Sequence, residues 1–188
     1  SIFAELDFLR MFKLCPVSFI RETNNIPAGI DDGERIAVYG DYDADGVTST
    51  YILVDYLQSL GADCTYHIPD RFGDGYGVSK TALDALAADG VSLVVTVDTG
   101  ITAAEEIAYA GELGLDVVVT DHHKCEEILP EACAVVNPNR EDCEYPFKSL
   151  AGVGVAFKVA QALLMDKYTF ENVANSWLKT CYYYDYLG

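Results

Sequence analysis

Short runs rich in apolar residues alternate with longer segments of helical spacing along most of the chain. The runs have the length of strands and are predicted as strands at 36–39, 64–68, 93–97, 117–120 and 134–136. The run at 93–97 contains almost no polar residue, which is typical of a central strand in a parallel sheet.

Helices are predicted between these runs, at 47–60, 79–88, 102–113 and 152–165. Gly61, Gly90 and Gly114 follow the first three and are predicted helix ends, because glycine readily adopts the left-handed conformation. Thr48 or Ser49 is expected to support the start of the first of these helices. A further helix is predicted at 2–14, and 24–34 is predicted to be a loop rich in Asn, Asp and Gly.

Strand and helix alternate at least four times, and this alternation defines the expected fold class. It predicts an α/β fold with a doubly wound, mainly parallel sheet of about five strands and helices on both faces. Residues 1–34 are expected to form an N-terminal helical and loop segment, and 35–188 the main domain.

Polar clusters follow three of the predicted strands at their carboxyl ends. They contain Asp41, Asp43 and Asp45 after the first strand, Asp98 after the third, and Asp121, His122 and His123 after the fourth. Ligands of open parallel sheets bind at this edge, so the sequence predicts a single site there.

The three alternating carboxylates Asp41, Asp43 and Asp45 repel one another unless cations hold them together. Oxygen ligands suit hard divalent ions, so Mg²⁺ or Mn²⁺ is expected. An acidic surface turn is the alternative. A calcium loop of the EF-hand type is excluded because Ile52 stands where that loop needs a Glu.

Composition restricts the function further. The 188-residue chain has a net charge of −18, which repels a nucleic-acid backbone unless bound cations or another domain intervene. No apolar run is as long as a membrane span, and a cytoplasmic protein is expected. A zinc site of Cys125, Cys133 and Cys143 near the histidines fits no standard spacing, and no nucleotide-binding glycine motif follows a strand.

Four motifs together resemble those of the DHH phosphoesterases, and within them the RecJ-type single-strand-specific DNA exonucleases. The motifs are 40–46 (GDYDADG), 97–100 (VDTG), 121–123 (DHH) and 152–158 (GVGVAFK), and the resemblance covers about residues 35–162. The segment 68–77 is similar to a stretch typical of the RecJ branch.

The resemblance implies phosphodiester hydrolysis assisted by one or two Mn²⁺ or Mg²⁺ ions. It implies that Asp98 bridges two ions, that His123 faces the scissile phosphate, and that Asp121 orients a histidine ring. The metal ligands that it implies are Asp43, Asp45, Asp98 and His122, with Asp41 as a further candidate. Candidates for holding substrate phosphate are Arg71 and the backbone N–H groups of Gly152 to Gly154, although close helix packing equally explains these glycines.

The chain departs from the family pattern in two respects. A further metal-binding Asp expected after residues 184–188 is absent, and nothing corresponds to the DHH-associated domain that binds substrate. Residues 35–188 are therefore expected to be a C-terminally truncated DHH domain that is weak or inactive alone, with an incomplete second metal site.

The implied function is a 5′–3′ exonuclease acting on single-stranded DNA. Its implied partners are single-stranded nucleic acid, bound through the full-length protein, and DNA repair or replication proteins. The alternatives are a phosphodiesterase for short oligonucleotides or cyclic dinucleotides, and a non-catalytic DHH binding module.

Overall fold

Five parallel strands form one sheet in the computed structural model, which describes residues 25–70 and 77–167. The spatial order is β2-β1-β3-β4-β5. The strands are β1 (Arg35–Tyr39), β2 (Asp63–His67), β3 (Leu93–Val97), β4 (Asp116–Thr120) and β5 (Ala134–Val136). The predicted five-stranded parallel sheet is therefore confirmed.

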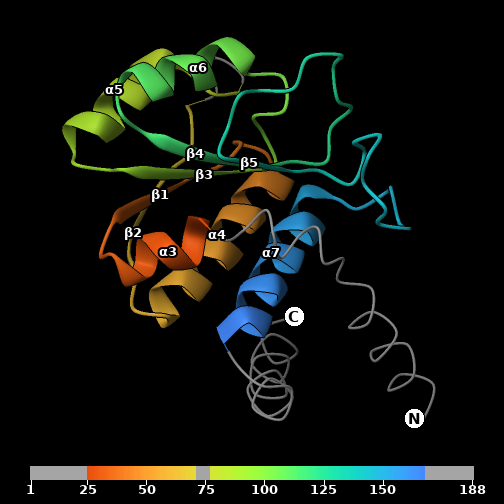
Figure 1. Ribbon diagram of the computed structural model, residues 1–188, viewed down its shortest axis with the longest axis horizontal. Coiled ribbons are helices and arrows are strands. Elements are labelled where there is room, and N and C mark those ends of the chain that lie inside the picture. Colours follow the sequence, from red (N-terminus) through yellow and green to blue (C-terminus); the bar gives the residue numbers. More distant parts are fainter. Residues whose placement is uncertain (1–24, 71–76, 168–188) are drawn as a thin grey trace.

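Helices cover both faces of this sheet (Figure 1). On one face lie α3 (Asn25–Asp31), α4 (Ala44–Ser59) and α7 (Gly152–Lys167), and on the other lie α5 (Lys80–Ala88) and α6 (Ala104–Glu112). The predicted doubly wound arrangement is confirmed. No helix in the part of the chain that the structure describes is long and apolar enough to cross a membrane.

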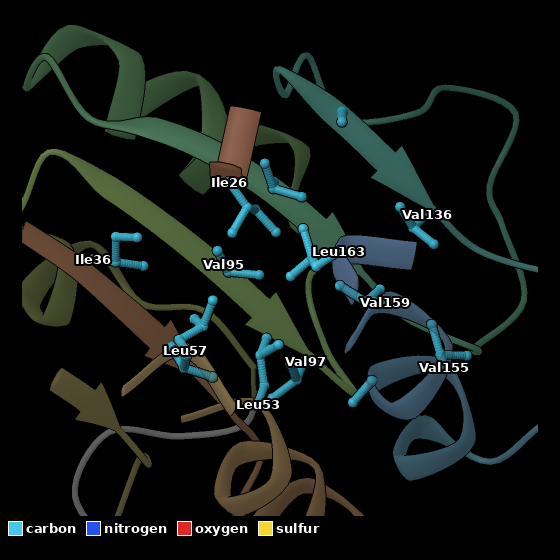
Figure 2. Close-up of a cluster of buried hydrophobic side chains, with 14 of the residues drawn as sticks. Ile26, Ile36, Leu53, Leu57, Val95, Val97, Val136, Val155, Val159 and Leu163 are labelled. Atoms are coloured by element: carbon cyan, nitrogen blue, oxygen red, sulfur yellow. The ribbon is translucent and has the colours of Figure 1, made fainter. Parts of the chain in front are cut away.

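Each face of the sheet has its own hydrophobic core, because successive side chains of a strand point to opposite faces. Ile36 and Val38 of β1 pack with residues of α4 and α7, and Ala37 and Tyr39 pack with residues of α5 and α6. Figure 2 shows the first core, where Leu53 lies beside Val97. Burial on both faces explains why β3, whose five residues are all buried, contains almost no polar residue.

The short helix α3 corrects the predicted loop over 24–34. Ile26 is fully buried in the core of Figure 2, and this long-range packing stabilises a helix that the local sequence does not indicate. Gly33, with φ of 73°, ends the helix, and the Glu34 N–H donates to the Gly29 carbonyl at 2.8 Å. The predicted helix at 2–14 lies outside the described residues.

The start of α4 also differs from the prediction. Its N-cap is Asp43, whose carboxylate accepts a hydrogen bond from the Gly46 N–H at 2.9 Å. Thr48 and Ser49 lie inside the helix, where both hydroxyls donate to the Asp45 carbonyl, so the prediction that one of them supports the helix start is wrong. The helix start is thereby part of the acidic motif.

Candidate metal centre

The order of the strands determines which polar clusters become neighbours. The chain leaves β1 toward β2 on one side and reaches β3 on the other, and such a switch point opens a crevice at the carboxyl ends. Asp41 and Asp43 follow β1, Asp98 follows β3, and His122 follows β4. Because β3 lies between β1 and β4, Asp98 occupies the centre of the site.

Two groups of potential metal ligands share Asp98. Asp41 and Asp43 form one group with it, and His122 and His123 form the other; in each group one ligand atom per residue lies within 4.8 Å of the others. Asp45 lies beside the second group, with its Oδ2 3.7 Å from Nε2 of His122. The structure thus brings all the predicted ligands together, and neither group contains a cysteine.

Asp98 is the most constrained residue of the site. It is 2% exposed, and its φ of 59° makes it the one described non-glycine residue with positive φ. Nε2 of His122 lies 3.0 Å from its Oδ1, but no described group donates a hydrogen bond to this buried atom. A buried acceptor without a hydrogen-bond donor is unfavourable, and a cation at this atom would offset that cost.

Burial, followed by the negative charges of Asp45 and Asp43, raises the pKa of Asp98 to about 7. The charge of Asp121 acts in the same direction, and His123 opposes it. A divalent cation reverses such an environment, because its charge favours the ionised carboxylate. The geometry, the buried oxygen without a hydrogen-bond donor and the electrostatics therefore all fit a metal ion at Asp98.

Asp45 connects this site to the start of α7. Its two carboxylate oxygens accept hydrogen bonds from the N–H groups of Gly152 at 2.8 Å and Val153 at 2.7 Å. The carboxylate therefore lies at the positive end of the α7 helix dipole. Gly152 also packs against Asp98, because a Cβ atom at this glycine would lie 2.3 Å from Oδ1 of Asp98.

The packing around Gly152 and Gly154 is relevant to the prediction that their N–H groups hold substrate phosphate. The Gly152 N–H donates to Asp45, and a Cβ at Gly154 would lie 3.0 Å from the Leu150 side chain. Close packing of α7 therefore accounts for both glycines. Arg71 lies outside the described residues.

Asp121 holds the second histidine of the motif. Its Oδ1 lies 2.7 Å from Nδ1 of His123, and its Oδ2 accepts from the Ile101 N–H at 3.0 Å. Burial lowers the pKa of His123, but the hydrogen bond to Asp121 and the surrounding carboxylate charges outweigh it and leave the pKa above its ordinary value. The aspartate thus orients the His123 ring and leaves Nε2 as the ring atom for other partners.

Four polar residues near the site had no role in the sequence prediction. Asn137 and Asn139 follow β5 and donate to the carbonyls of His123 and His122. The Thr96 hydroxyl donates to the Thr99 carbonyl, and the Thr120 hydroxyl donates to the Thr96 carbonyl, which connects the ends of β3 and β4. In the sequence, their position near the ends of predicted strands was the one feature that could have indicated a role at the site.

Fold and site together define a doubly wound α/β domain with a carboxylate and histidine cluster at its switch point. The DHH family, N-terminal domain, matches residues 35–183. The chain belongs to the DHH family, as the sequence motifs predicted.

The most informative relatives carry one name, single-stranded-DNA-specific exonuclease RecJ. The Bacillus subtilis protein is 52% identical over 141 residues, which cover 75% of this chain and 18% of that protein. The Escherichia coli protein is 50% identical over 133 residues, which cover 70% of this chain and 23% of that protein. The chain thus spans about a fifth of the length of these relatives.

Solved structures agree with the sequence relatives. A crystal structure of exonuclease RecJ bound to manganese has a TM-score of 0.69 and 38% identity, covering 78% of this chain and 37% of that chain. RecJ from Thermus thermophilus in complex with Mn²⁺ has a TM-score of 0.65 and 35% identity, covering 78% of this chain and 20% of that chain.

We expect Gly152→Ala to destabilise the chain by about 1–3 kcal/mol, because the added methyl group would collide with Asp98. Gly111→Ala is the matched control, since this glycine of α6 has open space around its Cβ position and alanine favours helix by about 0.5–1 kcal/mol. Urea unfolding of both variants checks the prediction. Equal midpoints for Gly152→Ala and Gly111→Ala would contradict the packing described here.

Proposed function

We propose that this chain forms the metal-binding part of a phosphodiesterase that removes nucleotides from an end of single-stranded DNA. The observation that carries the proposal is the pair of ligand groups sharing Asp98, whose buried oxygen has no hydrogen-bond donor among the described residues. The names of the relatives and the manganese in their solved structures support the same chemistry. Residues 35–188 form the DHH domain in this proposal, and 1–34 form a preceding segment.

The residues that would hold Mn²⁺ or Mg²⁺ are Asp43, Asp45, Asp98 and His122, with Asp41 beside them. When bound there, such ions would lower the pKa of an attacking water and offset the charge that builds on the phosphate. Asp98 belongs to both ligand groups and is therefore the residue that we assign as the bridge.

His123 acts on the phosphate in this proposal. Because an ionised carboxylate can only accept, the contact with Asp121 places a proton on Nδ1 of His123. The Nε2 atom remains for a hydrogen bond to a phosphate oxygen, and the side chain is 44% exposed, compared with 27% for His122. Asp121 holds the ring in this orientation through its own bonds to backbone N–H groups.

The net charge of −18 gives the chain little attraction for a DNA backbone outside the cation site. We therefore assign most of the contacts with DNA to the parts of the natural protein that its longer relatives have outside the matched region. Arg71 is the residue of this chain that we assign to a substrate phosphate. We place the protein in the cytoplasm, with DNA repair or replication proteins as its partners.

The proposal is tested on the natural protein that carries this chain, with Mn²⁺ and DNA labelled at the 5′ or the 3′ end. We expect loss of single nucleotides from single strands and little cleavage of a blunt duplex of the same sequence. Preference for dinucleotides or cyclic dinucleotides would replace the exonuclease proposal by the alternative phosphodiesterase. Metal binding without hydrolysis of any of these substrates would indicate a non-catalytic module.

Asp98→Asn should lower turnover at least about a hundredfold, because the residue loses the charge that the cations need. Asparagine has the same shape and tolerates positive φ, so the fold should persist. Asp116→Asn, at the opposite edge of the sheet, is the matched control and should keep full turnover. Single-turnover assays together with circular dichroism check this, and a folded, fully active Asp98→Asn protein would refute the assigned bridge.

Substitutions of the two histidines should have different effects on metal binding and on turnover. We expect His122→Ala to weaken Mn²⁺ binding, measured by calorimetry, whereas His123→Ala should mainly lower turnover at saturating Mn²⁺. Both histidines belong to one ligand group in the structure, so their positions alone do not separate a metal ligand from a phosphate contact. Loss of Mn²⁺ to the same extent in both variants would show that His123 is a metal ligand and not a phosphate contact.

The 188-residue chain alone should cleave single-stranded DNA at least about tenfold more slowly than the natural protein that carries it. Its acidic surface contributes few phosphate contacts, and substrate positioning contributes strongly to rate. Parallel assays on one labelled strand measure the ratio. Equal rates would show that residues 1–188 suffice for both binding and hydrolysis.

A further inference from the structure

The two asparagines after β5 contact the histidine motif through its backbone. Asn137 is 1% exposed, and its Nδ2 donates to the His123 carbonyl at 2.9 Å. The Nδ2 of Asn139 donates to the His122 carbonyl. Oδ1 of Asn137 accepts from the backbone N–H of Asn139 at 2.8 Å, so the Asn137 side chain also holds the backbone of Asn139.

The N–H groups of the same two histidines are held from the other side. Oδ1 of Asp121 accepts from the His122 N–H at 2.7 Å and from the His123 N–H at 3.0 Å. Both peptide groups next to each ring are therefore oriented by side chains, that of Asp121 after β4 and those of the asparagines after β5. A rotation of any of these peptide groups would displace a neighbouring histidine ring.

We propose that Asn137 and Asn139 are positioning residues with separate targets, His123 for Asn137 and His122 for Asn139. Both side chains donate to carbonyls of the histidine motif, so in this proposal they act through the histidine backbone. In this proposal the last strand of the sheet contributes to the site without supplying a ligand. The inference rests on the proposed function for the separate roles of the two histidines.

The test uses two variants of the natural protein that carries this chain. Asn139→Ala, at an exposed position, should raise the Kd for Mn²⁺ about tenfold in calorimetry, and added Mn²⁺ should restore its lost turnover. Asn137→Asp keeps the acceptor for Asn139 and removes the donor to His123. It should lower kcat about tenfold at saturating Mn²⁺, with an unchanged KM for DNA, and added Mn²⁺ should not restore it.

Gln58→Ala is the matched control, because the Gln58 amide also donates to a backbone carbonyl, that of Cys64, on the exposed side of α4. Gln58→Ala should change neither the Kd for Mn²⁺ nor kcat. Unaltered Mn²⁺ affinity in Asn139→Ala would overturn the proposal. Equal losses of affinity and kcat in both asparagine variants would also overturn it, as would the same losses in Gln58→Ala. If Asn137→Asp does not fold, Asn139→Ala decides alone. If the natural protein hydrolyses no DNA, the proposed function fails, and the Mn²⁺ titration of Asn139→Ala still tests the inference.

Discussion

Repulsion among carboxylates at one edge of the sheet is the constraint on which the rest of the site depends. Asp41, Asp43, Asp45 and Asp121 each accept at least one hydrogen bond from a backbone N–H group. These bonds give each of the four carboxylates a partner without any cation. Oδ1 of Asp98 has no such donor in the described residues, so the central carboxylate is the one where a cation would contribute most.

The backbone donors come from elements that are positioned by the hydrophobic core. Val155 and Val159 of α7 are buried against the sheet in Figure 2, and this packing sets the start of the helix beside Asp45. The resulting bond from Gly152 joins residues 107 positions apart. A change in the packing of α7 would therefore alter the acidic cluster from a distance.

Local pattern was sufficient for the elements themselves and for the edge at which the site lies. The apolar run of β3 predicted its bounds, because a strand buried on both faces has few polar positions. Gly61, Gly90 and Gly114 have positive φ, between 79° and 87°, as expected for glycines that end helices. The clusters after β1, β3 and β4 predicted a common site, because parallel strands end at one edge.

Contacts between segments far apart in the sequence decided the features that the local hydrophobic pattern does not predict. The burial of Ile26 made α3 a helix, and strand order placed Asp98 between the other two clusters. The Asp45 bonds to α7 and the Asn137 bond to His123 likewise join segments whose adjacency arises only when the sheet and helices pack. The sequence by itself determined which residues are candidate metal ligands and at which end of each strand they lie. Tertiary structure decided which of them touch, because hydrogen bonds and charges act over a few ångströms of space and not along the chain.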